Sequence, residues 1–198
     1  SSSQHATHVA GMLAGSGATS AQFGGTDRQW RGVAPRATLF SYDFMLPIDE
    51  FSNAIEQHGS DVLQNSWGFL TLCNDYAIYE GHAQMYDEIV AGKYLHRPSV
   101  VFAAGNSQSF CDSHYGTVLQ GAQVAKNVIT VGAIHSDDNS MTDFSSWGPT
   151  KDGRLKPELV AAGDERGGDG GIKSTYSEVD YGVLTGTSLA APVVSGEL

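Results

Sequence analysis

The 198-residue sequence has few basic residues: 22 acidic side chains outnumber 11 lysines and arginines, for a net charge of −11. Proteins that bind nucleic acid need a basic surface, so this balance argues against such a partner. The sequence also lacks an apolar run of membrane-spanning length and a recognisable signal peptide. With 40% hydrophobic and 17% charged residues, we expect a folded protein that does not enter a membrane.

Cysteine is scarce as well. The chain contains Cys73 and Cys111, and their spacing alone leaves open whether they pair or stay free. No internal repeat or linker divides the sequence, so its length suits one domain with a sizeable core. We therefore treat residues 1–198 as a single domain.

Extended and helical patterns alternate along the chain. The extended stretches are 37–44, 61–67, 99–104, 127–134 and 157–161, and a hairpin is expected over 172–184. Helical patterns cover 5–15, 49–59 and 76–90 and resume at or beside Ser188. The run at 99–104 is apolar without interruption, which is typical of a strand buried on both faces. This alternation predicts an α/β fold with a mostly parallel sheet, whose sites gather at the carboxyl ends of the strands.

Ser188 stands directly before an apolar run that predicts a buried helix, with Pro192 in its first turn. A helix N-terminus offers free N–H groups and the positive end of the helix dipole, and both would stabilise an oxyanion beside the Ser188 hydroxyl. A serine in this position can also be a simple helix cap with no chemical role.

Four short motifs decide between these interpretations, because together they resemble those of the subtilisin-like serine proteases, the subtilases. Residues 5–11 resemble the family's histidine motif, 65–68 its substrate-binding strand, 103–106 its oxyanion-asparagine motif and 186–192 its nucleophile motif. Segments 126–133, 144–149 and 152–159 extend the resemblance over nearly the whole chain. The resemblance implies a three-layer α/β fold, with a mostly parallel central sheet flanked by helices, and a serine endopeptidase.

The resemblance also implies a role for each matching residue. Ser188 would be the nucleophile, His5 its general base and Asn106 a donor to the oxyanion. Two walls would bind an extended peptide or protein substrate: Ser66, Trp67 and Gly68 on one side, and Ala103, Ala104 and Gly105 on the other. Acyl-enzyme chemistry of this kind requires no cofactor, and the family's location implies a secreted or cell-envelope protein, in which a disulfide could clamp the two site loops.

Metal binding is less well supported. His8 could pair with His5 as ligands on one helix face, but no third ligand accompanies them, so we expect a structural histidine. Calcium is common in the family, yet the acidic stretches 137–143 and 164–169 are better explained as solvated loops. The candidate ligands in them are Asp137, Asp138, Asn139 and Asp143 in the first stretch and Asp164, Glu165 and Asp169 in the second. We expect no metal ligand in this site.

The sequence departs from the family at its ends. The family's catalytic aspartate precedes the histidine, whereas only residues 1–4 precede His5, and the helix after Ser188 is short. Asp43 and Asp61 match no family motif. We therefore expect a partial catalytic domain, truncated at both ends and nearly inactive alone, because no aspartate orients His5. An absent strand would expose a gap through which copies could associate.

Two other functions fit parts of the sequence less well. A non-catalytic relative could bind extended peptides in the same groove, but His5, Asn106 and Ser188 are all present, which disfavours it. An α/β-hydrolase would place serine before histidine and a glycine at position 190, where this chain has Ala190.

Overall fold

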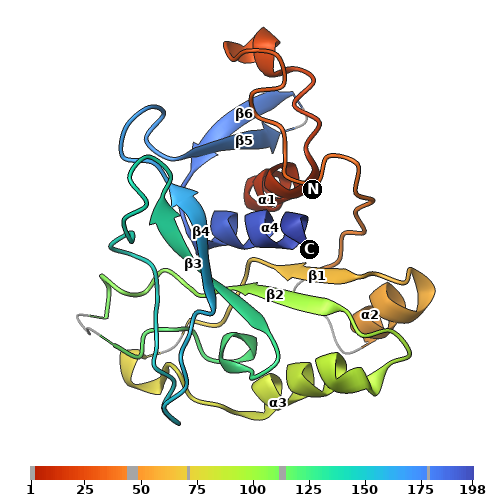
Figure 1. Ribbon diagram of the computed structural model, residues 1–198, viewed down its shortest axis with the longest axis vertical. Coiled ribbons are helices and arrows are strands. Elements are labelled where there is room, and N and C mark those ends of the chain that lie inside the picture. The colour runs from red at the N-terminus through yellow and green to blue at the C-terminus, as the bar shows by residue number, and fades with distance from the viewer. Residues whose placement is uncertain (1–2, 44–48, 71, 112–114, 178) are drawn as a thin grey trace.

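The computed structural model describes residues 3–43, 49–70, 72–111, 115–177 and 179–198. Its centre is a parallel four-stranded sheet in the order β1-β2-β3-β4, shown in Figure 1. These strands are β1 (Val62–Asn65), β2 (Ser99–Ala103), β3 (Ile129–His135) and β4 (Leu159–Asp164). The predicted hairpin is confirmed as antiparallel β5 (Ile172–Ser177) and β6 (Asp180–Leu184).

Helices cover both faces of the sheet. On one side lie α1 (Gln4–Ala14) and α4 (Thr187–Glu197). On the other lie α2 (Asp49–Ser52) and α3 (Gly81–Glu88), which continue as π-helical turns over Asn53–Gln57 and Ile89–Lys93. Short 3₁₀ turns cover Ser20–Phe23, Cys73–Asp75 and Ala122–Val124. This arrangement confirms the predicted α/β fold, and no helix within the described ranges has the length and hydropathy needed to span a membrane.

The central strand β2 shows why its sequence is apolar throughout. Successive side chains of a strand point to opposite faces. Val100 and Phe102 join the core cluster under α3, while Val101 and Ala103 join the cluster under α4. Both faces of the strand are therefore buried, as the uninterrupted apolar run predicts.

The helices α1 and α4 lie side by side (Figure 1) and share the neighbour Val33 at their C-terminal ends. The Val33 N–H donates to the Met12 carbonyl of α1 at 3.1 Å. At the end of α4, a Cβ placed on Gly196 would lie 2.7 Å from the Val33 Cβ. The first turns of the two helices, which carry His5 and Ser188, are therefore the ends that lie away from Val33.

Two predicted elements differ from the structure. The strand predicted over 37–44 is wrong for residues 37–43, which form no strand, and Phe44 lies outside the described residues. A strand needs a neighbour to complete its hydrogen bonds, and β1 is an edge strand that pairs with β2 alone in the described part of the sheet. The helix predicted from residue 76 begins at Gly81, because Ala77 has a positive φ of 62° and its N–H donates to the Val118 carbonyl.

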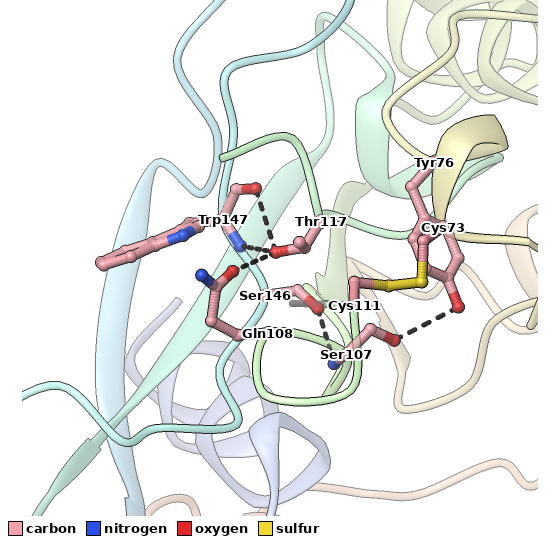
Figure 2. Close-up of a disulfide and its surroundings, with 8 residues drawn as sticks. All are labelled: Cys73, Tyr76, Ser107, Gln108, Cys111, Thr117, Ser146 and Trp147. Carbon is pink, nitrogen blue, oxygen red and sulfur yellow. Dashed lines mark hydrogen bonds between the residues drawn. A yellow bond between two sulfur atoms is a disulfide. The ribbon is translucent and has the colours of Figure 1, made fainter. Parts of the chain in front are cut away.

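Cys73 and Cys111 form a disulfide, which settles the alternative that their spacing left open. Figure 2 shows this bond beside the turn that follows β2. Within the turn, the Cys111 N–H donates to the Ser107 carbonyl at 2.9 Å, and the Ser107 N–H donates to the Ser146 hydroxyl at 2.9 Å. The Ser107 hydroxyl donates to the Tyr76 hydroxyl at 3.3 Å. The disulfide therefore ties the chain after β1 to the turn after β2.

We expect replacement of both cysteines by alanine to lower the free energy of unfolding by about 2–4 kcal/mol, because a cross-link between residues 38 positions apart restricts the unfolded chain. Urea unfolding monitored by circular dichroism measures this difference. The unmodified protein in a reducing agent is the matched control and should give the same lowered midpoint. An unchanged midpoint in both samples would show that the bond does not contribute to stability.

Candidate active site

The start of α4 is held by Asn106, which follows β2. The Asn106 Oδ1 accepts hydrogen bonds from the Thr187 N–H and the Thr187 hydroxyl, both at 2.9 Å. The same hydroxyl accepts from the Gly105 N–H at 3.1 Å. With its oxygen engaged twice, the carboxamide has its two Nδ2 donors left, and the side chain is exposed. Asn106 can therefore donate to an anion that forms beside the start of α4.

Ser188 is positioned by a proline and by a second serine. Pro192 lies inside α4 and not in its first turn, which corrects the sequence-based expectation. A proline has no N–H, so the carbonyl four residues earlier, that of Ser188, loses its helical partner. The Ser66 hydroxyl donates to this carbonyl at 2.6 Å. The chain that leaves β1 is thus joined directly to the residue that carries the candidate nucleophile.

The segment before Ser188 is fixed to a third strand. The Gly186 N–H donates to the carbonyl of Gly163 in β4 at 2.8 Å. Contacts from the ends of β1, β2 and β4 therefore converge on residues 186–188 at the carboxyl edge of the sheet. This is the edge at which parallel α/β sheets place their sites.

The two predicted substrate walls also lie at this edge. Residues 66–68 follow β1 and residues 103–105 close β2, and the two strands are paired, with Asn65 opposite Phe102. The Trp67 indole packs edge-on against the Phe102 ring, with centroids 5.4 Å apart, and its N–H donates to the Asn65 Oδ1 at 3.0 Å. Ala103, Ala104 and Gly105 are buried. The walls are therefore joined by contacts between the two strands, and the β2 side carries little side-chain bulk.

His5 lies in the first turn of α1, where the Ser3 hydroxyl caps the helix by accepting from the Ala6 N–H at 3.0 Å. Partial burial lowers the pKa of His5 below its ordinary value of 6.5. No carboxylate among the described residues contributes to this shift. Neither the His5 imidazole nor the Ser188 hydroxyl makes a hydrogen bond within the described part of the chain. The structure thus places both in helix first turns without joining them.

His8 has a structural position. Its Nε2–H lies 3.0 Å from the Ile172 carbonyl and 3.1 Å from the Gly182 carbonyl, so the buried ring links α1 to both strands of the hairpin. Burial lowers the pKa of His8, which favours the neutral ring.

The side chains of the acidic loops form hydrogen bonds with neighbouring residues of the same two loops. Asp138 accepts from Ser140 and from the Arg166 guanidinium, and Asp137 accepts from the Arg166 N–H. Across the residues that the structure describes, no three His, Cys, Asp or Glu side chains are grouped so that they could hold a metal ion.

No pattern in the sequence marks residues 118–123 as part of the site, yet they run between the two walls. The Leu119 N–H donates to the Ala104 carbonyl at 3.0 Å, and the Gln123 amide donates to the Trp67 carbonyl at 2.8 Å. The sequence likewise assigns Thr187 no role of its own in the site. Its position between a glycine and the candidate nucleophile is the one signal that indicates such a role.

The family of the chain follows from comparison with known proteins. The model described as "Subtilase family" matches residues 1–198. "Serine protease AprX" of Bacillus subtilis is 29% identical over 221 residues, which covers 97% of this chain and 47% of AprX. "Subtilisin-like proteinase Mp1" of Magnaporthiopsis poae is 30% identical over 210 residues, which covers 97% of this chain and 42% of Mp1.

Among solved structures, "Sphericase" superposes with a TM-score of 0.67 at 24% identity, covering 98% of this chain and 62% of that one. The likeness at this identity shows a shared fold. The chain spans less than half the length of the two curated relatives. Because the family match extends over every residue, the chain belongs to the subtilases, a family of serine peptidases.

Proposed function

We propose that this chain is part of the catalytic domain of an endopeptidase that hydrolyses peptide bonds through an acyl-enzyme on Ser188. The observation that carries the proposal is the orientation of Asn106, whose Oδ1 is held by Thr187 and whose Nδ2 remains available beside the nucleophile. The Ser188 N–H, one of the first in α4, has no intrahelical acceptor and would be the second oxyanion donor. Ser188, His5 and Asn106 are the proposed catalytic residues.

The reaction follows from these groups. The Ser188 Oγ attacks the substrate carbonyl carbon while His5 takes its proton. The carbonyl oxygen becomes an oxyanion that accepts hydrogen bonds from Asn106 and from the Ser188 N–H. His5 then protonates the departing amine, and a water molecule, deprotonated by His5, releases the acyl group and restores the serine. The steps balance with water alone, so we propose no cofactor.

The substrate would be an extended peptide segment of a protein. Its backbone would lie between residues 66–68 and 103–105 and add a strand to the edge formed by these walls. We further propose a secreted or cell-envelope location, which the Cys73–Cys111 disulfide supports, because such bonds persist in oxidising compartments.

We propose that no carboxylate among the described residues orients His5, because the pKa of the imidazole is shifted by burial alone. The 198-residue chain alone should then hydrolyse a chromogenic peptide about 10⁴ times more slowly than the full-length protein, in line with the loss of the aspartate in subtilisin. Initial-rate assays on both proteins measure the ratio. Ser188→Ala in the full-length protein is the background control.

If the chain alone turned over substrate as fast as the full-length protein, and Ser188→Ala abolished this activity, the proposal that the carboxylate is missing would be contradicted.

A second candidate function, a non-catalytic peptide-binding domain, is favoured by one observation, the absence of a hydrogen bond between His5 and Ser188 in the described part of the chain. No turnover by the full-length protein above its Ser188→Ala background would support that candidate.

Asn106→Ala in the full-length protein should lower kcat by about 10²–10³, the cost measured for the corresponding kind of donor in subtilisin, with little change in KM. The reason is that the carboxamide binds the oxyanion and not the ground-state carbonyl. Steady-state kinetics on a peptide anilide separate the two constants. Asn74→Ala, at an exposed asparagine of a 3₁₀ turn, is the matched control and should leave kcat unchanged. A rise in KM at constant kcat would contradict the assigned role.

We also propose that the isolated chain self-associates through the open edge of β1. In the described part of the sheet, residues 62–65 pair with β2 on one side alone, and an unpaired strand edge can bind another chain. Light scattering over a concentration series should show a mean mass that rises above 21.0 kDa. A mass that stays at the monomer value at the highest concentration would rule out this association.

A further inference from the structure

Leu119 lies between the two substrate walls. Past the ends of β1 and β2, the segment 118–123 is bonded to both: the Leu119 N–H to the Ala104 carbonyl at 3.0 Å, and the Gln123 amide to the Trp67 carbonyl at 2.8 Å. A backbone bridge between Phe69 and Gln120 adds a further link. The segment therefore crosses between the two proposed walls, of which we call it the floor, and its position is fixed by hydrogen bonds to both.

The Leu119 side chain occupies the space at this floor. A Cβ placed on Gly105 would lie 2.4 Å from the Leu119 Cγ, and one placed on Gly68 would lie 2.6 Å from the Leu119 Cδ1. Real Cβ atoms do not approach so closely, so the isobutyl group rests on the bare Cα of a glycine from each wall. Leu119 is 6% exposed. The room between Gly68 and Gly105 is thus already filled by a side chain of the protein.

We propose that Leu119 determines substrate specificity by restricting the residue before the cleaved bond to a small side chain, glycine, alanine or serine. This inference rests on the proposed function, because a substrate strand bound to both walls directs that side chain toward the floor between them. A close-packed floor can admit a larger group only by displacing Leu119, whose neighbours on both sides are backbone. A pocket of this kind discriminates by about 10–200-fold for each methylene that does not fit.

Two properties of the floor indicate that the accepted side chain is uncharged as well as small. The Leu119 side chain is an isobutyl group, and Ala103 and Ala104 of the adjoining wall are buried and apolar. The Gln123 amide, which is 1% exposed and donates to the Trp67 carbonyl, carries no charge and so offers no counter-charge to a charged substrate group. A charged side chain at this position would lose its hydration without a partner, which is unfavourable.

The test compares two peptide anilides, succinyl-Ala-Ala-Pro-Ala- and succinyl-Ala-Ala-Pro-Phe-p-nitroanilide, on the full-length protein. We expect kcat/KM to favour the alanine peptide by at least about 10-fold. Leu119→Ala, which empties the floor, should lower this ratio by about 10–200-fold. Val124→Ala is the matched control: Val124 is buried directly after this segment and belongs to the core cluster under α3, so the ratio should not change. Leu119→Val, a smaller change, should move the ratio in the same direction if Leu119→Ala does not fold.

A binding measurement separates this inference from the proposed function. In a Ser188→Ala background, calorimetric titration with the same two peptides reports the preference of the groove without cleavage. Tighter binding of the alanine peptide that is lost in Leu119→Ala supports the inference, whether or not the protein cleaves either peptide. Absence of cleavage would overturn the proposed hydrolysis but not the inference. The inference would be overturned if the protein bound both peptides equally, bound neither, or cleaved both at the same rate. It would also be overturned if Leu119→Ala left the ratio of the two kcat/KM values unchanged.

Discussion

The site depends on a hydrogen bond that a missing N–H makes possible. Pro192 cannot donate to the Ser188 carbonyl, and the Ser66 hydroxyl takes that place at 2.6 Å. A carbonyl that already accepts an intrahelical bond has one lone pair left, whereas the missing N–H of Pro192 leaves the Ser188 carbonyl to the chain that leaves β1. The helix loses one internal hydrogen bond at Pro192. The bond from Ser66 takes its place and fixes the distance between the proposed substrate wall and the candidate nucleophile.

The same logic extends to the other contacts at the start of α4. Asn106 binds Thr187 from the end of β2, and Gly163 binds Gly186 from β4. Each partner lies at the carboxyl edge of a parallel sheet, where successive strand ends are neighbours in space although they are far apart in sequence. Preorganised donors of this kind are effective because they need no rearrangement when charge develops.

Much of this arrangement could be predicted from the sequence, for reasons specific to each segment. The apolar run of β2 is buried on both faces, and glycine ends α1 where the pattern places it. Residues 37–43 show the limit, because whether a β-prone segment becomes a strand depends on a neighbour that its own sequence does not specify. The late start of α3 has a similar cause, a tertiary hydrogen bond between Ala77 and Val118.

Roles for the motif residues could be proposed from the sequence because catalysis restricts the residue type at each position, whereas no such pattern marks Leu119. An apolar residue in an apolar segment is typical of core, and only its contact with glycines of both walls gives it another meaning. The sequence likewise does not indicate that Pro192 frees the Ser188 carbonyl. The pattern indicates a proline in the first helical turn, whereas the structure places Pro192 later in α4. In both cases the decisive information is which distant backbone lies opposite the side chain.

The central claim, that Ser188 is a nucleophile activated by its surroundings, is tested most directly by treating the full-length protein with a fluorophosphonate and locating the adduct by mass spectrometry. The account predicts one stoichiometric adduct on Ser188, whose formation requires the folded protein and is lost in His5→Ala. An unlabelled Ser188 in the folded full-length protein, or labelling spread over several exposed serines, would contradict it.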